Sequence, residues 1–246
     1  MVANFIDWNS AFVRQCPKLG IKSFQKNGVR NTLIPLLISY FQDRHQSIKW
    51  RGVITSPKIV NGGGPQGATL GIIEYISQSN NSADCVDPED RFKFVDDLTI
   101  LEIVNLLTIG LTSFNIKHQV TNYIITENQF IPTENFKSQL SLNNINSWTE
   151  ENMMKINESK TKTMIFNFTN KYQFSTRLRI NNKILETVSE TKLLGTIISN
   201  NLKWDKNTSN ITKKAYSRLE LLKKLSSFQA PTKDMKQIYV AYIRSL

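Results

Sequence analysis

The spacing of hydrophobic and polar positions along this chain predicts a mixture of helices and strands. Apolar residues recur at helical spacing in 31–42, 68–77, 138–152, 207–225 and 234–246. Short apolar or alternating runs predict strands at 3–8, 46–53, 163–168 and 192–198. Two hairpins are expected, one in 91–101 with its tip at Asp96-Asp97 and one at 176–188 around Asn181-Asn182. Residues 115–138 show no clear period, which predicts a long loop.

Charge is distributed unevenly along the chain, whose net charge is +11. Residues 1–100 carry 11 basic and 9 acidic side chains, and residues 101–150 carry 2 and 4. Residues 151–246 carry 18 and 7, so their surplus of 11 equals the net charge of the whole chain. A one-sided basic segment favours a polyanionic partner such as nucleic acid, although a solvated lysine-rich surface has the same composition.

Composition narrows the class of protein. The length of 246 residues and the 40% hydrophobic content allow a folded core. Two cysteines, Cys16 and Cys85, and two histidines offer no disulfide framework and no histidine-based zinc site, which favours a reducing compartment. No secretory signal and no run of 18 apolar residues is present. We therefore expect an intracellular protein that is not secreted and has no membrane partner.

Asp96-Asp97 is the most distinctive feature, because aspartate is depleted in strands and this pair interrupts an apolar hairpin. Two carboxylates ~4 Å apart repel by ~4 kcal/mol at an effective dielectric of ~20. A divalent cation relieves that repulsion, and oxygen ligands with no neighbouring His or Cys favour Mg²⁺ or Mn²⁺. An acidic turn without any metal is the alternative.

A second acidic position, Asp7, ends another apolar strand. Acidic residues at the ends of two strands can converge at one edge of a sheet and hold two metal ions for an in-line phosphoryl displacement. A metal-dependent phosphohydrolase would fit Asp7 and Asp96 as well. That class normally needs further acidic or histidine ligands, and no suitable motif supplies them.

Three motifs around these aspartates resemble those of reverse transcriptases from non-LTR, LINE-like retrotransposons. Residues 5–12, FIDWNSAF, resemble the first catalytic motif, although Val13 follows where the family usually has Asp. Residues 62–71, GGGPQGATLG, resemble the second motif, a Pro-Gln-Gly turn leading into a helix. Residues 94–97, FVDD, resemble the aromatic-x-Asp-Asp motif.

Two later segments extend the resemblance almost from end to end of the chain. Trp148, Asn157 and residues 160–162, KTK, lie where the next family motif has a Trp, an Asn and a Lys-Thr pair. Residues 193–198, LLGTII, followed by residues 202–204, LKW, resemble the connection towards the thumb. Each motif alone is weak, but five in the family's order are specific.

The resemblance implies an α+β fold, in which the antiparallel sheet of a polymerase palm is backed by helices and followed by a partial helical thumb. The palm with its catalytic motifs would occupy 1–170, and the palm–thumb connection with a partial basic thumb would occupy 171–246. Only six residues precede Asp7, so the fingers are absent from this sequence. We therefore expect the chain to lack catalysis by itself.

Residue roles follow from the same resemblance. Asp7, Asp96 and Asp97 would be catalytic and would bind the Mg²⁺ or Mn²⁺ ions, together with the backbone carbonyl of Trp8. The residues expected to contact the nucleotide are Ala11, Phe12, Gln66, Gly67 and Lys160, with Phe12 also a candidate core aromatic. The residues expected to grip nucleic acid lie on the basic helix: Lys213, Lys214, Arg218, Lys223 and Lys224.

The implied reaction is RNA-directed DNA synthesis, in which a primer 3′-hydroxyl attacks a dNTP on an RNA or DNA template. Its partners would be the primed template and the dNTP. The alternative is a remnant of a retroelement that binds nucleic acid without catalysis.

Overall fold

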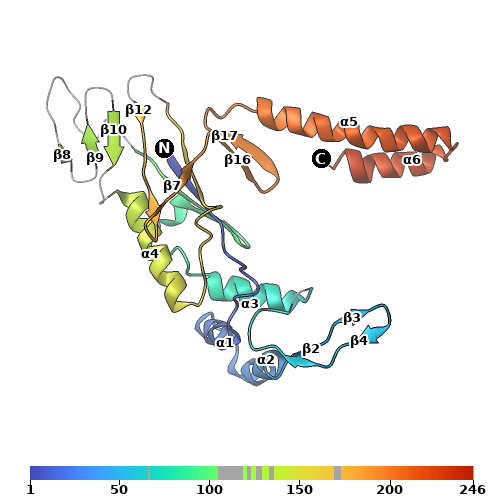
Figure 1. The fold of residues 1–246 in the computed structure, drawn as a ribbon, viewed down its shortest axis with the longest axis horizontal. Helices are drawn as coiled ribbons and strands as arrows, with labels where there is room; N and C mark the ends of the chain where they lie inside the picture. Colours follow the sequence, from blue (N-terminus) through green and yellow to red (C-terminus); the bar gives the residue numbers. More distant parts are fainter. Residues whose placement is uncertain are drawn as a thin grey trace. The chain divides into compact units, whose positions relative to one another are not determined.

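The computed structural model describes residues 1–65, 67–104, 119–120, 123–125, 129–132, 136–168 and 173–245 (Figure 1). The chain is a mixed α/β protein that divides into two compact units, Met1–Thr187 and Val188–Leu246. Residues 173–187 therefore belong to the same unit as the N-terminal strand, whereas the sequence-based division placed the boundary at 170/171.

A five-stranded sheet organises the first unit, with the order β15-β11-β1-β7-β6. Its antiparallel pairs are β1–β11, β1–β7 and β6–β7, whereas β11 and β15 are parallel. The sheet is thus mixed, not wholly antiparallel. The strands are β1 (Val2–Ile6), β6 (Arg91–Phe94), β7 (Asp97–Glu102), β11 (Lys162–Ile165) and β15 (Glu186–Thr187).

The central strand β1 explains why the sequence begins with an apolar run. Val2 and Ile6 point to one face of the sheet and are buried with Ile100 of β7. Ala3 and Met164 are also buried, on the opposite face. A strand buried on both faces is mostly apolar, without the alternation of a surface strand. The polar residue of β1, Asn4, is buried and accepts a hydrogen bond from Thr163 Oγ1 at 2.8 Å.

Two helices cover the face that carries Val2 and Ile6. They are α3 (Thr69–Ser79), which contributes Tyr75 to the core, and α4 (Lys137–Glu151), which contributes Leu142 and Ile145.

A second, smaller apolar cluster joins α1 (Pro17–Lys26) and α2 (Ile34–Phe41) around Phe24, Ile34 and Phe41. Short 3-10 turns precede α2 and β6, namely η1 (Asn31–Leu33) and η2 (Pro88–Asp90). The sequence pattern did not predict α1.

Short strand pairs complete the first unit. They are β2 (His45–Gln46) with β5 (Lys58–Ile59), β3 (Lys49–Trp50) with β4 (Val53–Ile54), and β13 (Arg179–Ile180) with β14 (Lys183–Ile184). A four-stranded sheet has the order β12-β10-β9-β8, from β8 (Gln119–Val120), β9 (Tyr123–Ile125), β10 (Gln129–Pro132) and β12 (Gln173–Phe174).

Two expectations for these segments were wrong. Residues 46–53 are not one strand, because the chain turns at Arg51-Gly52. The range 115–138 is not simply a loop, because it contains β8, β9, β10 and the start of α4, and the rest of it lies outside the described residues. The Asn181-Asn182 hairpin turn is confirmed, with both residues at positive φ.

The second unit consists of a hairpin and helices. The expected single strand at 192–198 is instead the hairpin of β16 (Glu190–Leu193) and β17 (Thr196–Ser199), which turns at Leu194-Gly195. The long helix α5 (Asp205–Ser227), which has no fully buried residue, is followed by α6 (Thr232–Ile238) and a π-helical turn, η4 (Tyr239–Ile243). No helix within the described ranges is long and apolar enough to cross a membrane.

Candidate active site

The backbone around Asp7 is held on both sides. Strand β1 ends one residue earlier, where Ile6 pairs with Leu98 of β7, so that Asp7 lies beside the first residue of β7, Asp97. On the other side the Asp7 amide donates to Thr161 Oγ1 at 3.2 Å, and its carbonyl accepts from the Asn157 amide at 2.7 Å. The first and fourth motifs of the sequence therefore meet at Asp7.

Asp96 and Asp97 occupy the tip of the β6–β7 hairpin. Phe94 pairs with Asp97, which leaves Val95 and Asp96 as the two turn residues, one position earlier than expected. Val95 has a φ of 54°, a left-handed conformation that β-branched residues rarely adopt. Such a residue costs of order 1–3 kcal/mol, which the paired strands on both sides of the turn have to offset.

The three aspartates interact electrostatically. Burial raises the pKa of Asp7, and Asp96 raises it further, whereas Lys160 and a hydrogen bond from Asn157 lower it. Burial also raises the pKa of Asp97, with added contributions from Asp96 and then Asp7. The fold thus places like charges together, an arrangement that a cation would relieve.

One oxygen atom of this cluster has no hydrogen-bond partner among the described residues. Asp7 Oδ2 is buried and accepts no hydrogen bond from any described residue. As they stand, the described residues contain no group of three or more acidic, histidine or cysteine side chains that could hold a metal ion. The donor chemistry at Asp7 nevertheless matches a divalent cation, because an unpartnered carboxylate oxygen next to two interacting carboxylates offers the oxygen ligands that Mg²⁺ takes.

Trp8 continues the strand after Asp7, in an isolated antiparallel bridge to Ile156. The hydrogen bonds on either side of this bridge use the carbonyls of Asp7 and Lys155, not that of Trp8. The indole of Trp8 is buried and lies edge-on to Trp148, with ring centroids 6.0 Å apart. The side chain therefore belongs to the core, and the backbone carbonyl is the part that could serve as a ligand.

An aromatic pair lies beside the aspartates. The rings of Phe12 and Tyr75 are stacked, with centroids 4.8 Å apart and planes tilted by 39°. Tyr75 is buried, and its pKa is raised first by burial and then by Asp96 and Asp97. The sequence predicted Phe12 as a site residue but not Tyr75. The position of Tyr75 on the helix that follows the glycine loop is the feature that could have indicated it. Ala11 is buried in the same core.

Residues 62–64, the first part of the glycine loop (62–67), pack directly on the segment that follows Phe12. The Gly64 amide donates to the Phe12 carbonyl at 2.9 Å, and the Gly63 amide donates to the Gln15 carbonyl at 2.8 Å. A Cβ added at Gly64 would lie 1.8 Å from Gln15 Oε1, so the buried Gln15 side chain would have to move to accommodate it. Gln66 lies outside the described residues, whereas Gly67 has a φ of 82° and open space around it.

Two ionisable side chains near this loop, Arg44 and Glu74, influence each other electrostatically without a direct contact between them. An Nη atom of Arg44 donates to the carbonyls of Gly62 and Gly63. Glu74 on α3 is fully buried, and burial raises its pKa to about 7, although the positive charge of Arg44 lowers it. Neither carboxylate oxygen of Glu74 has a hydrogen-bond partner within the described part of the chain. Sequence reasoning did not find this pair.

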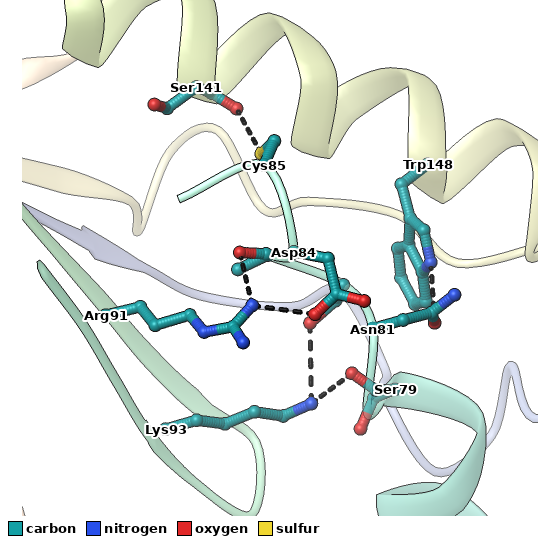
Figure 2. Close-up of polar contacts among 10 residues, drawn as sticks. Ser79, Asn81, Asp84, Cys85, Arg91, Lys93, Ser141 and Trp148 are labelled. Carbon is teal, nitrogen blue, oxygen red and sulfur yellow. Dashed lines mark hydrogen bonds and ion pairs between the residues drawn. The ribbon is translucent and has the colours of Figure 1, made fainter. Parts of the chain in front are cut away.

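Polar contacts attach the hairpin to the segment after α3 (Figure 2). Arg91 donates to the Ala83 carbonyl and to Asp84 Oδ1, each at 2.7 Å. Lys93 donates to the carbonyl of Ser79, the last residue of α3. Burial of the Lys93 ammonium group lowers its pKa to about 8, although the side chain as a whole is exposed.

The other side of the same segment is attached to α4. The indole N–H of Trp148 donates to Asn81 Oδ1 at 3.0 Å, and Cys85 Sγ lies 3.9 Å from the Ser141 carbonyl (Figure 2). The segment after α3 thus connects the hairpin that carries Asp96 to the helix behind the sheet.

The predicted nucleic-acid residues lie on α5 in the second unit. Arg218 donates to the Tyr242 carbonyl, and its guanidinium lies 4.4 Å from the centre of the Tyr242 ring. Lys214 and Arg218 line a pocket of about 330 Å³ beside the β16–β17 turn. The remaining basic residues are exposed: Lys213, Lys223 and Lys224.

A scan of the sequence against protein-family models found no match, and a search of curated protein sequences found none either. The family therefore stays an interpretation of the ordered motifs and of the geometry at Asp7, Asp96 and Asp97.

Proposed function

We propose that this chain is the palm, with part of the thumb, of a reverse transcriptase of the non-LTR type. The observation that carries the proposal is the meeting of Asp7, Asp96 and Asp97 at one edge of the β1–β7–β6 sheet, with Asp7 Oδ2 buried and without a partner among the described residues. Three motifs separated by long stretches of sequence contribute to this one edge and its surroundings.

Asp7, Asp96 and Asp97 would hold the divalent ions, with the Trp8 carbonyl as a further oxygen ligand. Bound there, Mg²⁺ would neutralise charge on the attacking and leaving oxygens of a phosphoryl transfer. In that transfer a bond forms between the primer 3′-oxygen and the α-phosphorus of the dNTP, and the bond to pyrophosphate breaks.

The remaining site residues would position the nucleotide. The Phe12 and Tyr75 rings contact each other next to the aspartates, and Phe12 would lie against the sugar of the dNTP. Lys160, whose charge acts on Asp7, would neutralise the departing pyrophosphate. The open backbone at Gly67 would allow close approach of a base or phosphate.

Primer extension on an RNA template with Mg²⁺ tests the reaction. The chain would be assayed alone and joined to a fingers segment of a non-LTR reverse transcriptase. We expect extension by the joined protein and its loss in Asp96→Asn/Asp97→Asn, whereas Asp234→Asn, an exposed carboxylate on α6, should leave it unchanged. Equal activity of the double variant would contradict the assignment of these two aspartates.

Metal binding gives an independent measurement that needs no fingers. Paramagnetic Mn²⁺ titrated into the chain should bind, and the double Asp96/Asp97 variant should bind at least about tenfold more weakly, because two of the three carboxylates are lost. Unchanged Mn²⁺ binding in that variant would place the metal elsewhere and overturn the proposed site.

The second candidate function is nucleic-acid binding without catalysis, which the basic α5 favours. It predicts salt-sensitive binding of oligonucleotides by the chain, together with no extension by the chain alone. Extension by the chain alone would exclude this candidate.

A further inference from the structure

Residues 43–60 form a two-stranded arm. At its root the Val60 amide donates to the Arg44 carbonyl at 2.8 Å, and β2 pairs with β5. Further out the Thr55 amide donates to the Ile48 carbonyl at 3.0 Å, and β3 pairs with β4. The tip is the two-residue turn Arg51-Gly52, with φ values of 47° and 85°, which suits the twist of a tight hairpin.

The arm exposes large apolar side chains on both faces. Trp50 and Val53 are cross-strand partners and are each 70% exposed, and Ile54, on the opposite face, is 62% exposed. Every residue from 45 to 59 is exposed. A two-stranded hairpin with no buried side chain is marginally stable in water, so these residues are suited to contact with a partner.

The charge of the arm indicates which partner. It carries four basic side chains and only Asp43 as an acid. The guanidinium of Arg51 lies 5.7 Å from the centre of the Trp50 ring, so an indole and a cation are presented together at the tip. Indole rings stack on nucleobases, and Lys and Arg side chains neutralise phosphates. Lysine is depleted at the centre of protein–protein interfaces. Lys49 lies on the same face of the arm as Ile54, which favours nucleic acid over a protein as the partner.

We propose that the 43–60 arm binds single-stranded nucleic acid, with Trp50 stacked on a base and with Arg51 and Lys58 beside the phosphates. The root of the arm is held against the glycine loop, because Arg44 donates hydrogen bonds to the Gly62 and Gly63 carbonyls. Within the proposed function, we assign the strand held by the arm as the template. That identity rests on the proposed function, but the binding itself needs none of the three aspartates.

Fluorescence anisotropy of labelled oligothymidylate, titrated with the full chain at several salt concentrations, tests the arm. Trp50→Ala should weaken binding at least about fivefold, because a base–aromatic stack is lost. Trp50→Phe should retain most of the affinity. Ile54→Ala is the matched control, an equally exposed apolar residue on the other face of the arm, and it should bind as the unmodified chain does.

Each outcome decides the proposal. Equal losses of oligonucleotide affinity in Trp50→Ala and Ile54→Ala would indicate a protein-docking surface and overturn the proposal. It would also be overturned if Trp50→Ala abolished a concentration-dependent self-association without changing the oligonucleotide affinity. Unchanged binding in Trp50→Ala would also overturn it. Arm-dependent binding by the chain, together with no primer extension by the fingers-joined protein that keeps all three aspartates, would leave the arm established and the polymerase function refuted.

Discussion

Glu74 is a charged group that the fold buries next to Gly20 of α1. A Cβ added at Gly20 would lie 2.6 Å from Glu74 Oε1, so the close approach of α1 and α3 encloses the carboxylate. Desolvation is the main cause that raises the pKa of Glu74, from 4.5 to about 7. Between these two pH values the folded chain binds more protons than the unfolded chain.

The free energy of unfolding should therefore fall as pH rises from about 4.5 to about 7, and Glu74 should account for about 3 kcal/mol of that fall. Glu74→Gln carries no titratable group and should remove this part of the pH dependence. Urea unfolding of both proteins at pH 5 and pH 8 measures the difference. Parallel pH profiles for the two proteins would show that Glu74 is not buried as described.

Among single residues, the sequence pattern identified those whose chemistry is unusual for their place in the chain. Asp7 and Asp96 stand out because each interrupts an apolar strand pattern. Glu74 and Tyr75 did not stand out, because a glutamate and a tyrosine in a helix are ordinary. Glu74 is buried against α1 and Tyr75 is buried in the core beside the aspartates, and local sequence encodes neither arrangement.

Helix α4 begins at a buried carboxylate from another element. Glu102 at the end of β7 accepts hydrogen bonds from the Ser138 amide at 2.7 Å and from the Ser138 hydroxyl at 2.6 Å. The N-cap residue, Phe136, has no side-chain oxygen to offer the first turn. A negative charge at a helix N-terminus also interacts favourably with the helix dipole.

Glu102→Gln should lower the free energy of unfolding by about 2 kcal/mol, because a charge-assisted hydrogen bond becomes a neutral one. Glu150→Gln is the control, an exposed glutamate in the last turn of the same helix, and it should change stability little. Urea unfolding of the three proteins measures both effects. A similar loss in both variants would mean that Glu102 does not act through the helix N-terminus.

Helices and strands with a clear period were predicted close to their observed bounds, such as 68–77 for Thr69–Ser79 and 138–152 for Lys137–Glu151. Two hairpins were misread as single strands. Their turns, Arg51-Gly52 and Leu194-Gly195, each have positive φ at both residues. Neither Arg51 nor Leu194 is a typical residue for the first position of such a turn, so the sequence pattern did not indicate these two turns. The turn at Asn181-Asn182 was predicted, because asparagine tolerates a positive φ.

The whole chain carries its excess positive charge in its C-terminal part, and α5 presents much of it. Lys213 and Lys214 are adjacent exposed residues on this helix, with no counter-ion among the salt bridges of the described residues. Contacts between such side chains and phosphates release bound counter-ions, so the affinity falls steeply with salt.

Lys213→Gln/Lys214→Gln should lower the slope of log affinity for an oligonucleotide against log salt concentration by about 1.5–2, whatever its sequence. The control pair Lys22→Gln/Lys26→Gln on α1 removes the same charge from the first unit and should leave the slope unchanged. Anisotropy titrations across salt measure both. Equal effects of the two pairs would indicate a response to net charge instead of contacts on α5.

The sequence by itself determined the mixed α/β content, the positions of most helices, the acidic tips of two strands and the basic C-terminal part, because these are local properties of spacing and residue type. The tertiary structure decided which residues come together. Asp7 and Asp97 are neighbours through the antiparallel register of β1 and β7, and Asn157 and Thr161 reach Asp7 from much later in the chain. Burial, orphaned oxygens and shifted pKa values follow from that packing, which no local pattern records.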